Sequence, residues 1–490
     1  MSEASAPQID KGRGPPFETS DLPESPKWTL LSTLRWMGPA GFIAIGIGIG
    51  SGEFLLAPAV TVRFGIEVIV WTAILAIVLQ AIQNVEMARY TILTGEPITI
   101  GFLRLPGGPK LWLPLSLYGT VSQVMWPGWA AAGATALVAM QLGRLPTPEE
   151  SGLVAAWAIV TFILMYLLVM TGAKTQRSLD IFFKVSTFTV VIVLIISAIW
   201  LVPGEVWWRA AKGFVSWGYI PPGMDWVALG AAIGYAGLGG GYFNAAITNW
   251  YRDKGVGMGA KVGYIPGLIG GHKLEFSPVG KSPPATPKNI RNFKGWMRLI
   301  HYEMWIPYFF FGLIGMIVPS MLYQAYVKEP LGGWGVAAML AEGVSKVIGP
   351  FGWYLMLIIA LLILYPTQVG VADEFPRQII DMLWFWPRVR KACRGDIRIP
   401  YYTLIAILWI FGIIIIATRL VRPLIMLVIA ATAALLGTVI TGVGTFLICV
   451  KLLPKEYKPS LWRLAALLVG AVFFGFFFII SLLSYMGIRL

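Results

Sequence analysis

Residues 46–53 of the sequence read GIGIGSGE, and residues 237–244 read GLGGGYFN. Each run lies near the middle of an apolar stretch that is long enough to cross a membrane as a helix. Because each glycine costs up to about 1 kcal/mol of helix stability, three or four together favour an unwound backbone. Such backbone is tolerated at membrane depth only where it faces protein or a water-filled cavity. The two runs therefore predict two broken helices whose breaks face the interior of the protein.

The composition indicates a membrane protein. Hydrophobic residues make up 57% and charged residues 13% of the 490 residues, and the mean hydropathy is +0.73. A soluble protein of this size needs more polar surface. A β-barrel would show alternating segments of about ten residues, whereas this chain has apolar stretches of helical length. We predict an all-α polytopic membrane protein with about eleven transmembrane helices, at residues 37–62, 66–94, 111–142, 152–171, 178–202, 225–250, 298–322, 351–384, 400–418, 421–450 and 461–486.

The predicted helices form a single transmembrane transporter domain over residues 37–486. Its two five-helix halves are expected at 37–202 and 225–450, with an extra helix at 461–486. Glycine-interrupted helices at the same position of two halves, here the first and the sixth, are typical of an inverted repeat with a binding site at the membrane midplane. Residues 1–36 are polar and proline-rich and lack the apolar segment of a signal peptide, so we predict a disordered cytoplasmic tail.

The positive charges indicate the orientation in the membrane. With the N-terminus in the cytoplasm, 29 of the 38 Lys and Arg residues fall on the cytoplasmic side of the predicted helices. This bias agrees with the positive-inside rule and predicts an integral protein of the cell (inner) membrane with its C-terminus outside. Topology thus accounts for the net charge of +14, and we expect membrane lipid, not nucleic acid, as a partner.

The two breaks predict where a substrate binds. A broken helix offers free N–H groups on its second half and free carbonyls on its first, so ions of either sign find partners. Burying the acidic side chain of Glu53 near the bilayer centre costs about 3 kcal/mol, which favours a role as cation ligand or proton acceptor over a helix cap alone. The expected substrate-binding residues are Gly50, Ser51, Gly52, Glu53, Gly239, Gly240, Gly241, Asn244 and Gln368. Of these, Glu53 and Asn244 are the expected metal ligands.

Other polar side chains within the predicted helices are weaker candidates. Interhelical hydrogen bonding is the expected role of Gln80, Gln83, Asn84, Ser122, Gln123 and Thr367. Glu86 and Arg89 have the spacing of an ion pair, and Asp373 and Glu374 are both expected to pair with Arg377. Only two histidines are present, which excludes an imidazole-rich metal site.

Several short motifs resemble those of the Nramp family of proton-coupled divalent-metal transporters. They are Gly38-Pro39-Ala40, Arg63-Phe64-Gly65, Ile92-Leu93-Thr94-Gly95 and the loop at residues 249–259. The resemblance implies the fold of the amino-acid–polyamine–organocation superfamily, with five plus five helices in an inverted repeat. It also implies a secondary transporter that works by alternating access, with protons as the coupling ion.

The chain departs from this family where the metal is expected to bind. Counted back from Arg63-Phe64-Gly65, the family's Asp-Pro-Gly-Asn motif falls on residues 50–53, so Gly50 replaces the metal-binding Asp and Glu53 the Asn. The family's Met-Pro-His sequence has no counterpart in residues 226–250. Because a thioether favours soft metals and oxygen ligands favour hard cations, we predict transport of a hard divalent cation such as Mg²⁺.

An alternative substrate is a small organic solute such as an amino acid or a carboxylate. Gly50-Ser51-Gly52 resembles the first helix break of amino-acid transporters in the same superfamily, and Gly239-Gly240-Gly241 would provide a second backbone cradle for a carboxylate. Close helix packing is another interpretation of the glycines. The sequence shows no nucleophile beside a base and no nucleotide-binding motif, so we predict neither an enzyme nor a cofactor.

Overall fold

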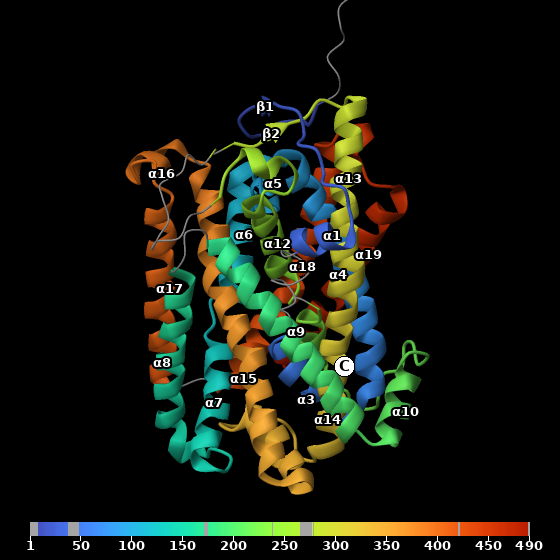
Figure 1. Cartoon of the computed structure of the whole chain (residues 1–490), viewed down its shortest axis with the longest axis vertical. Helices are drawn as coiled ribbons and strands as arrows, with labels where there is room; N and C mark the ends of the chain where they lie inside the picture. The colour runs from blue at the N-terminus through green and yellow to red at the C-terminus, as the bar shows by residue number, and fades with distance from the viewer. Residues whose placement is uncertain are drawn as a thin grey trace, which may run out of the picture.

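The computed structural model describes residues 8–37, 49–170, 175–237, 239–264, 277, 279–419 and 422–488. The chain forms a bundle of helices with one short two-stranded ladder at one end, at the top of Figure 1. The segment 8–37 lies at the end that carries this ladder, and residue 488 lies towards the other end, near α10.

Within the described ranges, eight helices are long and apolar enough to span a membrane. They are α4 (Ile66–Thr94), α8 (Ser151–Met170), α9 (Thr175–Leu201), the continuous α13 (Pro287–Glu303), π-helix (Met304–Phe311) and α14 (Gly312–Tyr326), α15 (Met339–Trp384), α17 (Arg398–Thr418), α18 (Pro423–Lys451) and α19 (Leu461–Tyr485). Each helix satisfies its own backbone hydrogen bonds, which lipid cannot do. The all-α membrane class is thereby confirmed, while the count of eleven and the inverted repeat stay predictions.

The sixth predicted helix is broken at its glycines. Its two parts are α11 (Trp226–Gly234) and α12 (Gly241–Lys254). Between them, Gly237 and Gly239 have φ angles of +82° and +98°, which glycine adopts without the steric cost of a side chain. The predicted break is therefore confirmed, although Leu238 within it lies outside the described residues.

The first predicted helix is described only from Ile49 onward. A π-helix (Gly52–Leu56) leads directly into α3 (Ala57–Phe64). A π-helix inside an α-helix is rare and is frequent at functional sites. The first half of the predicted helix, including Gly46, Gly48 and the motif Gly38-Pro39-Ala40, lies outside the described residues.

The third predicted helix, 111–142, also consists of two parts. The helix α6 (Gly108–Val124) ends before Pro127, and α7 (Gly128–Leu142) begins after it. Proline has no N–H group and its ring clashes with a carbonyl of the preceding turn. The prediction of one continuous helix here is therefore wrong, and Pro127 is the residue that signals the break.

The predicted disordered tail is wrong for residues 8–36. We call residues 8–37 the N-terminal strap, because they cross one end of the bundle in contact with several separate segments, among them α5 (Ile98–Arg104), β2 and α13. β1 (Glu18–Thr19) pairs in parallel with β2 (Lys281–Ser282), and α1 (Leu30–Trp36) follows. Ile9 and Leu22 are buried, and the indole N–H of Trp28 donates to the Gly295 carbonyl on α13 at 2.7 Å. A few buried apolar residues therefore hold the strap against the bundle, although the composition of the segment as a whole is polar.

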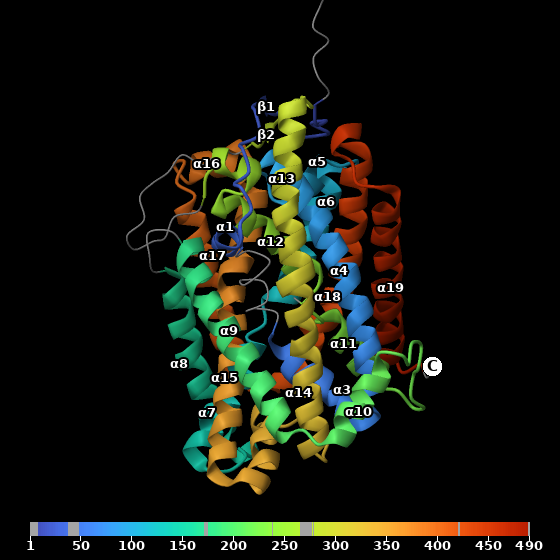
Figure 2. The ribbon, with the colours of Figure 1, turned by 45° about the vertical axis from the view of Figure 1, so that its right-hand side comes forward.

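Short helices complete the described chain. They are α5 (Ile98–Arg104), α10 (Gly204–Gly213), α16 (Pro387–Ala392) and the 3₁₀ turns Pro148–Glu150, Gly257–Lys261, Val336–Ala338 and Lys455–Tyr457. The helix α13 begins at Pro287, capped by the Thr286 hydroxyl, and extends beyond the bundle beside the strap (Figure 2). The two breaks lie inside the bundle, where α4, α14 and α18 pack against them.

Candidate functional site

The first break holds a buried carboxylate. Glu53 is in the first turn of the π-helix and has no exposed surface. The N–H of Gly50 donates to its Oε2 at 3.1 Å, which places the negative charge at the positive end of the half-helix. Within the described part of the chain, neither its Oε1 nor the Ser51 hydroxyl has a hydrogen-bond partner. One carboxylate oxygen is therefore available to a ligand.

The two breaks touch each other at Gly52, and α14 approaches both breaks closely at two further glycines. A Cβ on Gly52 would lie 2.7 Å from the carbonyl oxygen of Tyr235 in the second break. On α14, a Cβ on Gly315 would lie 3.1 Å from Cγ of Glu53, and one on Gly312 would lie 3.3 Å from Cα of Gly237. Any larger residue at Gly52 would push the breaks apart.

The glycine-rich backbone of the second break is already hydrogen-bonded within the protein. Gln123 on α6 donates from Nε2 to the carbonyls of Gly239 and Gly240, both at 2.8 Å. Its Oε1 accepts from the N–H of Tyr242 at 3.0 Å. The N–H of Gly241 donates to the Thr438 hydroxyl on α18 at 2.7 Å. In this conformation, side chains of α6 and α18 occupy the backbone groups predicted to cradle a carboxylate.

Asn244 lies in a polar cluster beside the second break. Its Nδ2 donates to Gln80 Oε1 at 2.9 Å, and Gln80 Nε2 donates to the carbonyl of Ala236 at 2.8 Å. The hydroxyl of Tyr308 also approaches Gln80 Oε1, at 3.3 Å. Among the residues that the structure describes, Oδ1 of Asn244 and both amide atoms of Asn84 have no hydrogen-bond partner. The cluster thus offers further unpaired oxygens.

The Asn244 cluster and Glu53 lie within reach of the same groups. The N–H of Gly237 and the hydroxyl of Tyr308 are both within electrostatic reach of the Glu53 carboxylate. A Cβ on Gly237 would lie 3.1 Å from that hydroxyl. We call Glu53, Gln80, Asn84, Asn244 and Tyr308 the central cluster. It contains a single acidic side chain and no sulfur or imidazole ligand. In the described ranges, no group of three His, Cys, Asp or Glu residues is arranged to hold a metal ion.

Gln368 occupies a different position from the other predicted site residues. Its Oε1 accepts from the N–H of Ala130 at 3.2 Å, just after the break between α6 and α7. Its Nε2 has no partner within the described residues. Gln80 and Gln123, which the sequence assigns only to interhelical hydrogen bonding, contact the second break directly. Nothing in their local sequence distinguishes them, because their partners lie more than a hundred residues away.

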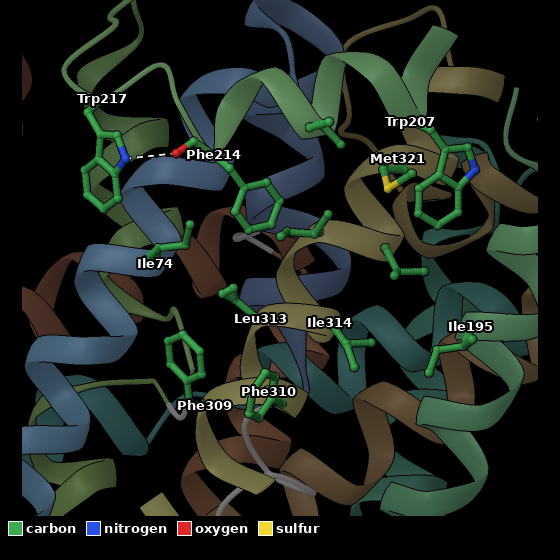
Figure 3. Close-up of a pocket in the computed structure, with 14 residues that line it drawn as sticks. Ile74, Ile195, Trp207, Phe214, Trp217, Phe309, Phe310, Leu313, Ile314 and Met321 are labelled. Carbon is green, nitrogen blue, oxygen red and sulfur yellow. Dashed lines mark hydrogen bonds between the residues drawn. The ribbon is translucent and has the colours of Figure 1, made fainter. Parts of the chain in front are cut away.

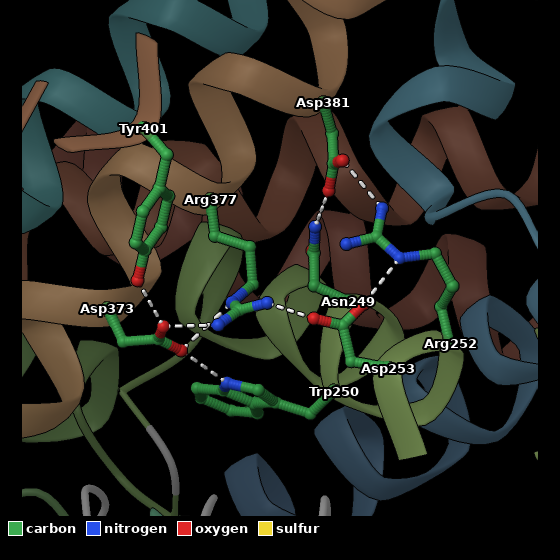
Figure 4. A network of polar contacts seen from close by, with 8 residues as sticks. All are labelled: Asn249, Trp250, Arg252, Asp253, Asp373, Arg377, Asp381 and Tyr401. Carbon is green, nitrogen blue, oxygen red and sulfur yellow. Dashed lines mark hydrogen bonds and ion pairs between the residues drawn. The ribbon is translucent and has the colours of Figure 1, made fainter. Parts of the chain in front are cut away.

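A second buried polar cluster lies near the C-terminal end of α12, and we call it the arginine network (Figure 4). Arg252 pairs with Asp253 at 2.7 Å and with Asp381 on α15 at 2.6 Å. Arg377 on α15 pairs with Asp253 and Asp373. Three further side chains donate hydrogen bonds to the carboxylates. Asn249 of α12 donates to Asp381, and Trp250 of α12 and Tyr401 of α17 both donate to Asp373.

The ion pairs predicted for this region are partly confirmed. Arg377 binds Asp373 as expected, and Arg89 binds Glu86 at 2.5 Å on α4. The prediction that Glu374 also pairs with Arg377 is wrong, because Glu374 accepts from Gln378 Nε2 at 2.8 Å. The spacing along the helix allows both pairs, but the guanidinium group of Arg377 is directed to Asp373 and to Asp253 of α12.

An apolar cavity of about 690 Å³ lies on the other side of α14 from the breaks (Figure 3). Its walls include Leu313 and Ile317 of α14, Ile74 of α4, and Trp207 and Phe214 from α10 and its C-terminal end. The polar faces of the breaks are not part of it. An environment this apolar is unsuitable for an ion, since nothing would replace its hydration shell.

Comparisons with known proteins identify solved structures that share the fold of this chain. No protein-family model matches the sequence, and no curated protein matches it. The Eremococcus coleocola manganese transporter, solved with an aromatic bis-isothiourea substituted compound, is 14% identical with a TM-score of 0.54. That alignment covers 97% of this chain and 91% of the transporter. MhsT in complex with L-phenylalanine is 15% identical with a TM-score of 0.52, over 94% of this chain and 99% of MhsT. The chain therefore shares their fold over nearly its whole length.

Proposed function

We propose that this protein is a proton-coupled secondary transporter that moves a hard divalent cation, such as Mg²⁺, by alternating access. The central cluster carries the proposal, because unpaired oxygens of Glu53, Asn84 and Asn244 gather beside the two breaks. Carboxylate and amide oxygens are ligands that Mg²⁺ accepts, and this ion retains several of its waters. Glu53 and Asn244 are the proposed ligands, and Glu53 is also the proposed proton acceptor.

The contacts of the second break favour a cation over an organic acid. The carbonyls of Gly239 and Gly240 and the N–H groups of Gly241 and Tyr242 already have partners on Gln123 and Thr438. An amino acid or a carboxylate held by this backbone would have to displace both side chains. The shared fold is compatible with either class, since one structural neighbour is a manganese transporter and the other holds L-phenylalanine.

Uptake by purified protein in liposomes tests the proposal. We expect Mg²⁺ uptake that is faster with an inward proton gradient than without one. We expect no uptake of amino or carboxylic acids. Glu53→Gln should reduce this uptake at least about tenfold, which corresponds to 1.4 kcal/mol of lost interaction. Glu329→Gln, the same change at an exposed position, is the matched control and should leave uptake unchanged. Uptake of an organic acid without any divalent cation would contradict the proposal and support the alternative.

A further inference from the structure

Among the buried carboxylates outside both clusters described above, that of Glu374 has an unpaired oxygen. Glu374 on α15 has no exposed surface. Its Oε1 accepts from Gln378 Nε2 at 2.8 Å, and Gln378 Nε2 also donates to the carbonyl of Tyr242 at 2.7 Å. Oε2 of Glu374 and Oε1 of Gln378 have no hydrogen-bond partner from any described residue. Two unpaired oxygens thus lie one helical turn apart on the same face of α15.

The orientation of the Gln378 amide follows from its contacts. Its NH₂ group donates to two oxygens, one on Glu374 and one on Tyr242. Exchanging the nitrogen and oxygen would bring three acceptors together with no donor. The side-chain oxygen of Gln378 is therefore the atom that is left for a ligand.

The neighbouring arginine network cannot neutralise Glu374. Its two guanidinium groups, of Arg252 and Arg377, face three carboxylates, those of Asp253, Asp373 and Asp381. Arg377 is directed to Asp253 and Asp373 and makes no ion pair with Glu374 in the described structure. A carboxylate buried without a counter-charge is strongly unfavourable, and it is relieved by binding a proton or a cation.

We propose that Glu374 and Gln378 form a binding site for one monovalent cation, either a proton or Na⁺. A proton on Glu374 removes the buried charge. A sodium ion does the same, and the two unpaired oxygens coordinate it as hard ligands. The chemistry common to both is neutralisation of one carboxylate, and the experiment below distinguishes them.

The groups that face Glu374 come from two directions. Asp373, on the same helix, adds repulsion between like charges, and the hydroxyl of Tyr235 in the second break is within electrostatic reach. The hydroxyl of Tyr242 is instead hydrogen-bonded to Ser116 on α6 at 3.1 Å. No described basic side chain contributes to the electrostatic surroundings of Glu374.

Tyr235 connects this site with the first break. Its backbone packs against Gly52, and its ring stacks on Trp129 at 6.0 Å between centroids. A cation at Glu374 therefore acts on the same segment that contacts the helix carrying Glu53. A role as the coupling site rests on the proposed transport function, whereas binding itself does not.

Two measurements on purified protein without any divalent ion test the site. The first is the infrared difference spectrum between acidic and alkaline pH, which reports buried carboxyl groups that gain a proton. The second is the midpoint of thermal unfolding in sodium chloride compared with choline chloride. Both are made on wild type, Glu374→Gln, which keeps the shape of the side chain, and Glu53→Gln as the matched control.

If a proton occupies the site, a carboxyl band present in wild type and in Glu53→Gln is lost in Glu374→Gln. If sodium occupies it, a sodium-dependent rise in the unfolding midpoint is lost in Glu374→Gln alone. The proposal is overturned if Glu374→Gln keeps both the bands and the sodium response of wild type, or if wild type shows neither. If Glu374→Gln does not remain monodisperse, Gln378→Met is measured in its place. We expect this variant to shift the midpoint of the carboxyl titration or to weaken the sodium response. Wild-type behaviour of Gln378→Met would contradict the site. Lack of divalent uptake would refute only the proposed function, because neither measurement uses a divalent ion.

Discussion

The central cluster and the arginine network are both buried polar groups inside the same bundle, and they differ in how well their charges are paired. In the network, each of the three carboxylates accepts from at least two donors (Figure 4). In the central cluster, Glu53 accepts from one backbone N–H and keeps an unpaired oxygen. Carboxylates that are paired in this way make a buried network rigid, although Oδ1 of Asn249 in the network has no partner among the described residues. A carboxylate with an unpaired oxygen leaves room for a ligand. We therefore assign a structural role to the network, and the unpaired oxygen of Glu53 supports the substrate binding that we propose for the cluster.

The largest effect is expected from removing a charge from the network. Arg377→Ala leaves Asp253 and Asp373 without their shared partner, and breaking a buried ion pair in this way costs about 3–5 kcal/mol. We expect a large decrease in the free energy of unfolding, measured by denaturant titration in detergent. Arg388→Ala, at an exposed position of α16, is the control. Equal stability of the two variants would contradict the structural role of the network.

A matched pair of acid-to-amide changes sharpens the comparison. Asp373→Asn weakens charged hydrogen bonds to Arg377, Trp250 and Tyr401, and losses of this kind cost about 1.5–3 kcal/mol. Glu53→Gln removes an unpaired charge and keeps an oxygen that can accept from Gly50, so its stability should stay within about 1 kcal/mol of wild type. The measurement is the same denaturant titration. If Glu53→Gln were the less stable of the two, Glu53 would be a structural residue rather than a ligand.

The sequence predicts the breaks because glycine acts locally. Gly237 and Gly239 adopt positive φ angles, which glycine allows wherever it occurs. The short glycine-rich stretch is therefore enough to predict the break. Pro127 carries an equally local signal, and the break between α6 and α7 could have been predicted from it. The strap could not be predicted in the same way, since Ile9 and Leu22 follow no helical or strand period.

The distribution of polar partners is not readable from the sequence. Gln123, Gln80 and Gln378 are all glutamines within apolar helices, and each contacts a backbone carbonyl of the second break or of α12. Which carbonyl each one meets depends on how α4, α6 and α15 pack. The same holds for Glu374, because Arg377 is directed to Asp373 and to Asp253, and the second of these contacts depends on how α12 and α15 pack.

Gln123 pairs the backbone of the second break, as the arginines pair the carboxylates of the network. It donates to the carbonyls of Gly239 and Gly240 and accepts from the N–H of Tyr242. Gln123→Leu keeps the volume and leaves the carbonyls of Gly239 and Gly240 without a donor, at a cost of about 1–3 kcal/mol. We expect reduced stability together with altered transport, because the freed backbone becomes available to a substrate. Gln141→Leu, on the exposed side of α7, is the control in unfolding and uptake assays. Unchanged stability would mean that water replaces the side chain without loss.

The smallest effect is expected from an exposed version of the same chemistry, in the strap. Asp21 accepts from Asn289 Nδ2 at 3.0 Å and pairs with Lys288 at 3.2 Å, with more than half of both charged side chains exposed. These contacts lower the pKa of Asp21 below its ordinary value of 3.8. Because the folded-state pKa is depressed, the stabilisation is complete above that ordinary value and disappears as the pH falls through the depressed one.

Water screens such a pair, so Asp21→Asn should lower the stability at neutral pH by at most about 1 kcal/mol. The difference from wild type should shrink as the pH falls below 3.8 and vanish below the depressed pKa of Asp21, where the carboxyl group is protonated in both states. High salt should also reduce it, because salt screens exposed charges. Thermal unfolding of the two proteins, at pH 7 and in a series of acidic buffers, provides the measurement. A difference that does not shrink with acidity would show that Asn289 binds the side chain irrespective of charge, and that even exposed contacts of the strap resemble the paired network more than the central cluster.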